Sequence, residues 1–162
     1  MSNNTVSDPL AEGFKLGRAR MNLVQMRDGV VIAEREAWNV ITKAQIDFMF
    51  QQSYKTSGLA ASGLNYIALS NSSLTEDSTS TTLSGEISSN GLSRAQGTVA
   101  HTNGTSTLTV TKTFTATGAQ SCQKAALFNA SSSGDMGHAL SFTSVTLATN
   151  DTLAVTFTIT LS

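Results

Sequence analysis

The last part of the chain alternates between two kinds of residue with almost no interruption. After the turn-forming pair Asn150-Asp151, every second residue is large and apolar, and the residues between them are Ala or Thr. Successive side chains of a β-strand point to opposite faces, so this pattern predicts a strand with one apolar face and one threonine face. The apolar positions are Leu153, Val155, Phe157, Ile159 and Leu161.

Strand-like runs separated by turn signals also occupy most of the preceding chain. Arg27-Asp28-Gly29 and Thr102-Asn103-Gly104 are typical of hairpin turns, and polar Ser/Thr-rich loops are expected at 70–85 and 130–137. Strands that recur about every ten residues between such turns predict a mainly β, antiparallel sandwich of jelly-roll-like type. The expected strands cover residues 18–26, 30–38, 66–69, 92–101, 105–115, 119–129 and 138–147.

One segment shows helical periodicity instead. Thr42 is followed three residues later by Gln45, which is the spacing of a capping box. Apolar residues then recur at helical spacing, so we expect one α-helix at about residues 43–56, after the amino-terminal hairpin, with its apolar face in the core. These apolar residues are Ile46, Met49, Phe50 and Tyr54.

The first 17 residues show no sustained periodicity and contain the only proline of the chain. We therefore expect an extended amino-terminal arm at 1–17, followed by a single domain at 18–162. The basic residues near the end of the arm would either be solvated or dock the arm on an acidic neighbour. The predicted partner-binding residues are Pro9, Phe14, Lys15, Arg18 and Arg20.

The composition narrows the possible partners. Charged residues make up 13% of the chain, about half of the usual share, and Ser and Thr together form roughly a quarter of it. The net charge is −1, so no basic field is available for nucleic acid. No apolar run is long enough to span a bilayer. We also expect no cleaved signal peptide, and hence synthesis in the cytoplasm.

Residues that could carry chemistry are few. His101 and His138 are expected at partly exposed strand ends, and their spacing does not suggest a metal site. Glu76 and Asp77 could bind a hard cation, although solvated loop carboxylates are the simpler interpretation. No nucleophile elbow or phosphate-binding loop occurs in the sequence. We therefore predict no catalytic residue, no metal, no cofactor and no enzyme activity.

Two further residues have both a structural and a functional interpretation. Cys122 is the only cysteine, and we expect a small buried side chain rather than a reactive thiol. Trp38 is the only tryptophan. It is expected to pack in the core, with stacking on a sugar as the alternative.

Several segments between Asn65 and Phe157 resemble a family of tailed-bacteriophage virion structural proteins. The family usually has Glu-Ala-Gly-Leu-Phe where this chain has Lys124-Ala125-Ala126-Leu127-Phe128, so a role tied to that acid or glycine cannot be carried over. The preceding Asn39-Val40-Ile41-Thr42 also looks similar. The matching segments are Asn65-Tyr66-Ile67-Ala68-Leu69, Leu83-Ser84-Gly85-Glu86-Ile87, Gly91-Leu92-Ser93-Arg94-Ala95, Lys112-Thr113-Phe114-Thr115-Ala116-Thr117-Gly118, Lys124-Ala125-Ala126-Leu127-Phe128-Asn129-Ala130 and Asp151-Thr152-Leu153-Ala154-Val155-Thr156-Phe157.

The resemblance implies two functions. The first is a capsid decoration (cement) protein on the outer capsid surface of the virion. It would form a homotrimer and bind the major capsid protein between capsomers. The second is a tail or fibre component that binds a host-surface glycan. The cement function predicts buried aromatic side chains, whereas the glycan function predicts an exposed cluster drawn from Trp38, Tyr54 and Tyr66.

Overall fold

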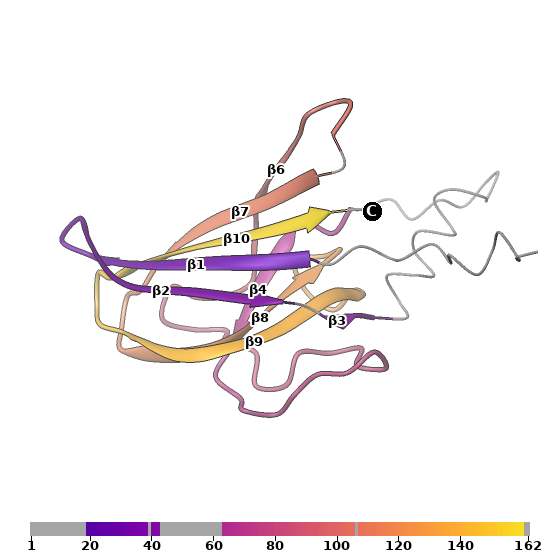
Figure 1. The fold of residues 1–162 in the computed structure, drawn as a ribbon. Helices are drawn as coiled ribbons and strands as arrows, with labels where there is room; N and C mark the ends of the chain where they lie inside the picture. Colours follow the sequence, from indigo (N-terminus) through magenta and orange to yellow (C-terminus); the bar gives the residue numbers. More distant parts are fainter. Residues whose placement is uncertain (1–18, 39, 43–62, 106, 161–162) are drawn as a thin grey trace, which may run out of the picture.

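The computed structural model describes residues 19–38, 40–42, 63–105 and 107–160 (Figure 1). The predicted arm at 1–17 and the predicted helix at 43–56 lie outside the described residues, and no helix occurs within these ranges. Four of the predicted partner-binding residues also lie outside them: Pro9, Phe14, Lys15 and Arg18.

The described chain is mainly β and forms two antiparallel sheets, as predicted. Sheet A has the strand order β2-β1-β10-β7-β6, and sheet B has the order β3-β9-β8-β4-β5. Every strand pair is antiparallel. The strands are β1 (Ala19–Arg27), β2 (Val30–Trp38), β3 (Val40–Ile41), β4 (Tyr66–Ser70), β5 (Ala95–Gln96), β6 (Thr98–His101), β7 (Thr107–Thr115), β8 (Gln120–Phe128), β9 (Met136–Leu147) and β10 (Thr152–Thr160).

Side chains from both sheets form one hydrophobic core. Met21 and Phe157 from sheet A and Ile67 and Leu127 from sheet B are completely buried in the same cluster. Burying a side chain of this size contributes about 1.5–3 kcal/mol relative to leaving it exposed. The alternation predicted for β10 is confirmed at Leu153, Val155 and Phe157, which are buried while the residues between them are half-buried. Ile159 is half-buried like its neighbours, and Leu161 lies outside the described residues.

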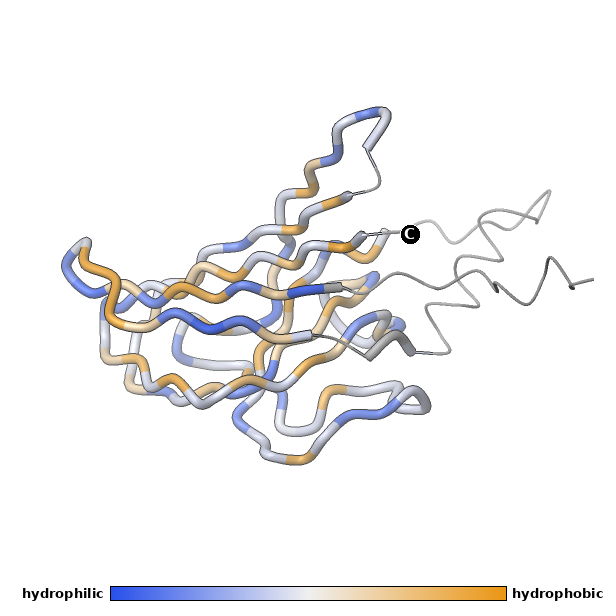
Figure 2. Tube along the Cα trace, viewed as in Figure 1, coloured by the Kyte–Doolittle hydropathy of each residue, from blue (hydrophilic) through white to orange (hydrophobic). Residues whose placement is uncertain are grey.

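The first hairpin is also confirmed, and its turn geometry explains why. Asp28 and Gly29 have φ angles of 50° and 77°, which is the positive-φ pair that a tight two-residue hairpin turn requires. Glycine adopts this conformation without strain, and aspartate tolerates it better than most residues. The hydropathy colouring in Figure 2 shows the apolar residues that follow this turn at the start of β2.

The single strand predicted at 92–101 is wrong, because the chain changes sheet within it. β5 pairs with β4 in sheet B, whereas β6 pairs with β7 in sheet A. Gly97 lies between them, and a Cβ there would approach the Val110 side chain to 2.8 Å and the Thr111 carbonyl oxygen to 3.1 Å. The change of sheet at this point therefore needs a residue without a side chain. The alternation of residues in the sequence does not indicate this requirement.

The outer face of sheet B is covered by the chain that follows β4. A second hydrophobic cluster lies there, with Phe128 and Met136 packed against Leu83 of the long loop. Arg94 lies 3.5 Å from the centroid of the Phe128 ring and makes two hydrogen bonds to Glu86, of 2.9 and 2.6 Å. One face of the molecule is therefore closed by its own loop.

Candidate functional site

The outer face of sheet A, in contrast, is lined mainly by threonines. Thr111 of β7 lies directly opposite Thr156 of β10, and their hydroxyl oxygens are 3.4 Å apart. Val110 and Phe114 of β7 alternate with these threonines and are buried in the core, as are Leu153, Val155 and Phe157 of β10, so the threonines point outward. We call this surface the threonine face. Its threonines are Thr98, Thr107, Thr109, Thr111, Thr113, Thr115, Thr152, Thr156, Thr158 and Thr160.

The other part of this outer face, on β1 and β2, is charged. Arg20 lies beside Trp38 in the strand register, and its Nη1 is 3.4 Å from Oε1 of Glu36. Asn22 donates a hydrogen bond of 3.2 Å to Glu34. We call Arg20, Glu36 and Trp38 the Arg20 corner. It lies next to Ala19, where β1 begins, so the one predicted partner-binding residue that the structure describes is on the open face.

The prediction that Trp38 packs in the core is wrong. Its side chain is 59% exposed, whereas the preceding residue, Ala37, is buried. In β2, Ala33 and Ala37 share the inner face, and Glu34, Glu36 and Trp38 share the outer face. The position of Trp38 follows from this alternation, which the sequence already contained.

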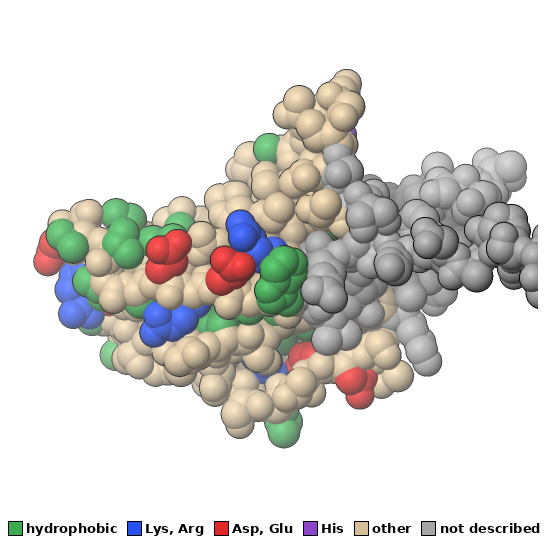
Figure 3. All heavy atoms as spheres, viewed as in Figure 1, with side chains coloured by type: hydrophobic (Ala, Val, Ile, Leu, Met, Phe, Trp, Pro, Cys, Tyr) green, Lys and Arg blue, Asp and Glu red, His purple; other side chains and the backbone are tan. Residues whose placement is uncertain are grey.

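Three consecutive apolar residues are exposed at the tip of the β1–β2 hairpin. Val30, Val31 and Ile32 are 64%, 53% and 46% exposed. Figure 3 shows hydrophobic side chains gathered at this end of the molecule, beside charged ones. Single exposed apolar residues are common on protein surfaces, but a consecutive run of this kind is not.

A buried carboxylate fixes the base of this tip. Asp151 is 1% exposed and accepts hydrogen bonds of 2.8 and 2.9 Å from Arg27 and of 3.0 Å from Gln25. It also accepts a 2.9 Å hydrogen bond from the Ala148 N–H. The hydrogen bond from Arg27 holds the pKa of Asp151 well below its usual range. No pattern in the sequence indicates that Arg27 is the partner of Asp151.

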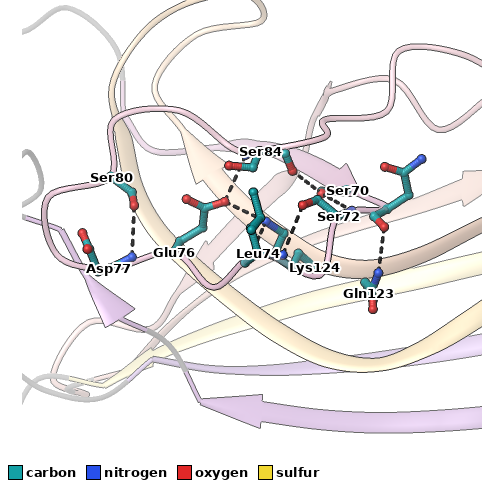
Figure 4. Close-up of polar contacts among 10 residues, drawn as sticks. Ser70, Ser72, Leu74, Glu76, Asp77, Ser80, Ser84, Gln123 and Lys124 are labelled. Atoms are coloured by element: carbon teal, nitrogen blue, oxygen red, sulfur yellow. Dashed lines mark hydrogen bonds and ion pairs between the residues drawn. The ribbon is translucent and has the colours of Figure 1, made fainter.

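A buried ion pair ties the long loop to sheet B (Figure 4). Lys124 Nζ is 2.7 Å from Glu76 Oε1, and the two side chains are only 1% and 7% exposed. Lys124 also donates to the Leu74 carbonyl oxygen at 2.7 Å, and the Ser84 N–H donates to Glu76 at 3.0 Å. The bonds made by Lys124 join β8 to the loop, and the bond from the Ser84 N–H to Glu76 joins two parts of the loop.

The interpretation of Glu76 as a solvated loop carboxylate is therefore wrong. Burial by itself raises its pKa, but hydrogen bonds from Lys124 and from the Ser84 N–H lower it overall. The signal in the sequence was Lys124, a charge directly before the apolar run at 125–128 of β8, because a buried charge needs a partner. Asp77, by contrast, is exposed as expected and accepts bonds of 2.7 and 2.6 Å from Thr79.

The two histidines and the cysteine lie in different environments. His101 is exposed, as predicted, but His138 is only 4% exposed, so the prediction of a partly exposed side chain is wrong there. His138 is buried because it lies on β9, an interior strand of sheet B, directly opposite Leu127 of β8. This burial lowers its pKa to about 4. Cys122 is buried as predicted, and burial raises the pKa of its thiol to about 12.

The part of the chain that the structure describes contains no group of three or more His, Cys, Asp or Glu side chains that could hold a metal ion. Within the same ranges, no helix has the length and apolar character needed to cross a membrane. Comparison with protein-family models, with curated proteins and with solved structures found no match. The candidate site is the outer face of sheet A together with the surfaces that adjoin it.

Proposed function

We propose that this chain is a structural, non-catalytic bacteriophage protein that decorates the capsid. As a jelly-roll β-sandwich made in the host cytoplasm, it would attach to the outer capsid surface of the virion between capsomers and stabilise the shell. Its partners would be the major capsid protein and further copies of itself, arranged as a trimer. The motif resemblance between Asn65 and Phe157 supports the virion assignment.

The observation that carries the proposal is the difference between the two outer faces. The outer face of sheet B is closed by the loop that Lys124 and Glu76 hold in place. The threonine face of sheet A, formed by β6, β7 and β10, presents hydroxyl and methyl groups without charged side chains. Such a face can pack against a neighbouring protein without charge repulsion. On a repeating lattice, many weak contacts of this kind add up to firm attachment.

The Arg20 corner supplies the residue types that dominate protein interfaces. Trp and Arg are enriched among the residues that contribute most to binding energy. Trp38 is 59% exposed, and Arg20 lies beside it in the register. The predicted arm residues lead into this corner along the chain, because β1 begins at Ala19. The arm and the corner would thus contact the same capsid subunit.

Sedimentation with capsid shells tests the proposal. The shells would come from the phage that encodes the chain and would first be stripped of accessory proteins. Full-length protein should pellet with them in a saturable manner. The double variant R20A/W38A should bind at least about tenfold more weakly, because truncating an anchor residue costs more than about 1.4 kcal/mol. A version without residues 1–17 should also bind more weakly.

The matched control is Leu74→Ala. Leu74 is 66% exposed, but it belongs to the loop over sheet B, so its removal should leave shell binding unchanged. Far-UV circular dichroism would confirm that each variant is folded. If folded full-length protein does not pellet with shells at any concentration, the capsid proposal is wrong.

The exposed indole of Trp38 favours a second function, a tail or fibre component that binds a host-surface glycan. An exposed tryptophan can stack on a sugar ring. Among the described aromatic residues it has no exposed companion, since Tyr66 and Phe142 are half-buried and Phe114, Phe128 and Phe157 are buried. Saccharide binding on a glycan array that is lost in W38A, together with no shell binding, would establish this alternative.

A further inference from the structure

The two sheets have four edge strands, which differ in how well they are protected against pairing with another chain. An edge strand presents unpaired N–H and C=O groups that can pair with another chain, and proteins usually block such edges with charge or keep them short. In sheet B the edge strands β3 and β5 have 2 residues each. In sheet A, β2 carries Glu34, Arg35 and Glu36. The remaining edge strand is β6.

β6 has neither kind of protection. It contains no Lys, Arg, Asp, Glu or Pro, and all four of its residues, Thr98–His101, are exposed. It pairs with β7 on one side at four positions, and the part of the chain that the structure describes places no strand on its other side. Figure 1 shows β6 rising away from the body of the two sheets. An uncharged edge exposed on both faces is suited to the addition of a strand.

We propose that two copies of this chain pair through β6, antiparallel about a twofold axis. A register centred on Val99 places Thr98 opposite Ala100 of the second copy, and a register centred on Ala100 places Val99 opposite His101. Neither register brings Lys, Arg, Asp or Glu side chains together. Both join the two A sheets into one continuous sheet, and the two threonine faces then form a single surface.

The charge pattern explains why the second copy pairs at β6 and not at β2, the other edge strand of sheet A. The register that pairs the whole of β2 with itself places Glu34 directly opposite Glu34 of the second copy. Like charges in directly opposed positions destabilise a strand pair. The pairing through β6 joins copies two at a time, so it is a contact additional to the one that would close a trimer.

Sedimentation velocity over a range of protein concentrations tests the pairing. The wild-type protein should show reversible association whose dissociation constant rises at least about tenfold in Ala100→Lys, because that lysine places like charges across the paired edge. Thr113→Lys is the matched control, since Thr113 is an exposed residue on the same outer face but belongs to β7 and not to the edge strand β6. The control should associate like the wild type.

Engineered cysteines determine the register and keep the proposal testable if a lysine disturbs folding. Opposed residues in an antiparallel pair have Cα atoms roughly 4.5–5.5 Å apart, which is within disulfide range. Under oxidation, Val99→Cys or Ala100→Cys should therefore form a covalent dimer, whereas Thr113→Cys should not. Native Cys122 is buried and does not compete. A wild-type protein that stays unassociated, association unaffected by Ala100→Lys, or cross-linking no faster than in the Thr113 control would each overturn the proposal.

Discussion

The substitution Glu76→Gln tests whether the long loop is held on sheet B by a buried charge pair. In the wild type, Lys124 Nζ is 2.7 Å from both Glu76 Oε1 and the Leu74 carbonyl oxygen, and its side chain is 1% exposed. Glutamine keeps the size and a hydrogen-bonding oxygen but removes the negative charge. The ammonium group of Lys124 would then remain buried with only neutral partners.

The expected loss of stability follows from this burial. Removing one partner of a buried ion pair costs about 3–5 kcal/mol, because the remaining charge is uncompensated. For a urea m-value of about 2 kcal/mol/M, that loss lowers the unfolding midpoint by roughly 2 M. A small domain has a total stability of about 5–15 kcal/mol, so the effect is a large part of it.

Urea unfolding followed by far-UV circular dichroism measures this change. The matched control is Glu36→Gln, which removes the carboxylate of the exposed pair with Arg20; the side chains of that pair are 47% and 51% exposed. Surface ion pairs contribute little, so the control should shift the free energy of unfolding by less than about 1 kcal/mol.

A double variant separates the charge from the shape of the site. Replacing Glu76 by Leu and Lys124 by Met together removes both charges and should recover at least about half of the loss seen in Glu76→Gln. The reasoning is refuted if Glu76→Gln unfolds within about 0.5 kcal/mol of the wild type, or if the double variant is less stable than the single one.

Two further substitution pairs test other parts of the structure. Burial lowers the pKa of His138 to about 4. The contribution of the neutral imidazole to the free energy of unfolding is therefore present in full above the ordinary pKa of about 6.5. It is lost as pH falls from there through the folded-state value, by about 3 kcal/mol in total. His138→Leu should flatten this acid limb in unfolding measurements at successive pH values, and exposed His101→Gln should not. Gly91 and Gly104 have φ angles of 74° and 84°, but a Cβ on Gly91 would lie 2.1 Å from the Thr115 carbonyl oxygen, whereas nothing lies within 4 Å of one on Gly104. Gly91→Ala should therefore lower the melting temperature more than Gly104→Ala, and equal losses would contradict the clash.

The local elements were largely predictable, because each depends on neighbours in the sequence. The alternation in β10 and the Asp28-Gly29 turn predicted a strand and a hairpin that the structure confirms. The exposure of Trp38 could also have been predicted, since it shares a strand face with Glu34 and Glu36. Tryptophan is usually well buried, but the exposure of this one is set by its place in the alternation of β2 and not by its residue type.

The candidate surfaces depend on partners that are far apart in the chain. Glu76 and Lys124 are 48 positions apart, and Gln25 and Asp151 are 126 apart. From the sequence alone, a carboxylate in a polar loop, such as Glu76, is expected to be solvated. Only the fold places the buried cation of Lys124 beside it. The switch of sheets at Gly97 is similar, because the contact that excludes a side chain comes from Val110 on another strand.

The sequence by itself determined that the chain is mainly β, where most strands and turns lie, and that one side of β7 and β10 is threonine. These properties depend on side-chain alternation and turn chemistry, which act between residues close in the chain. Only the tertiary structure decided which face is closed and which is open. The covering of sheet B depends on the Lys124–Glu76 contact, and the exposure of β6 depends on the order of strands in sheet A. Both follow from long-range packing, because burial is a property of the assembled layers and not of any one segment.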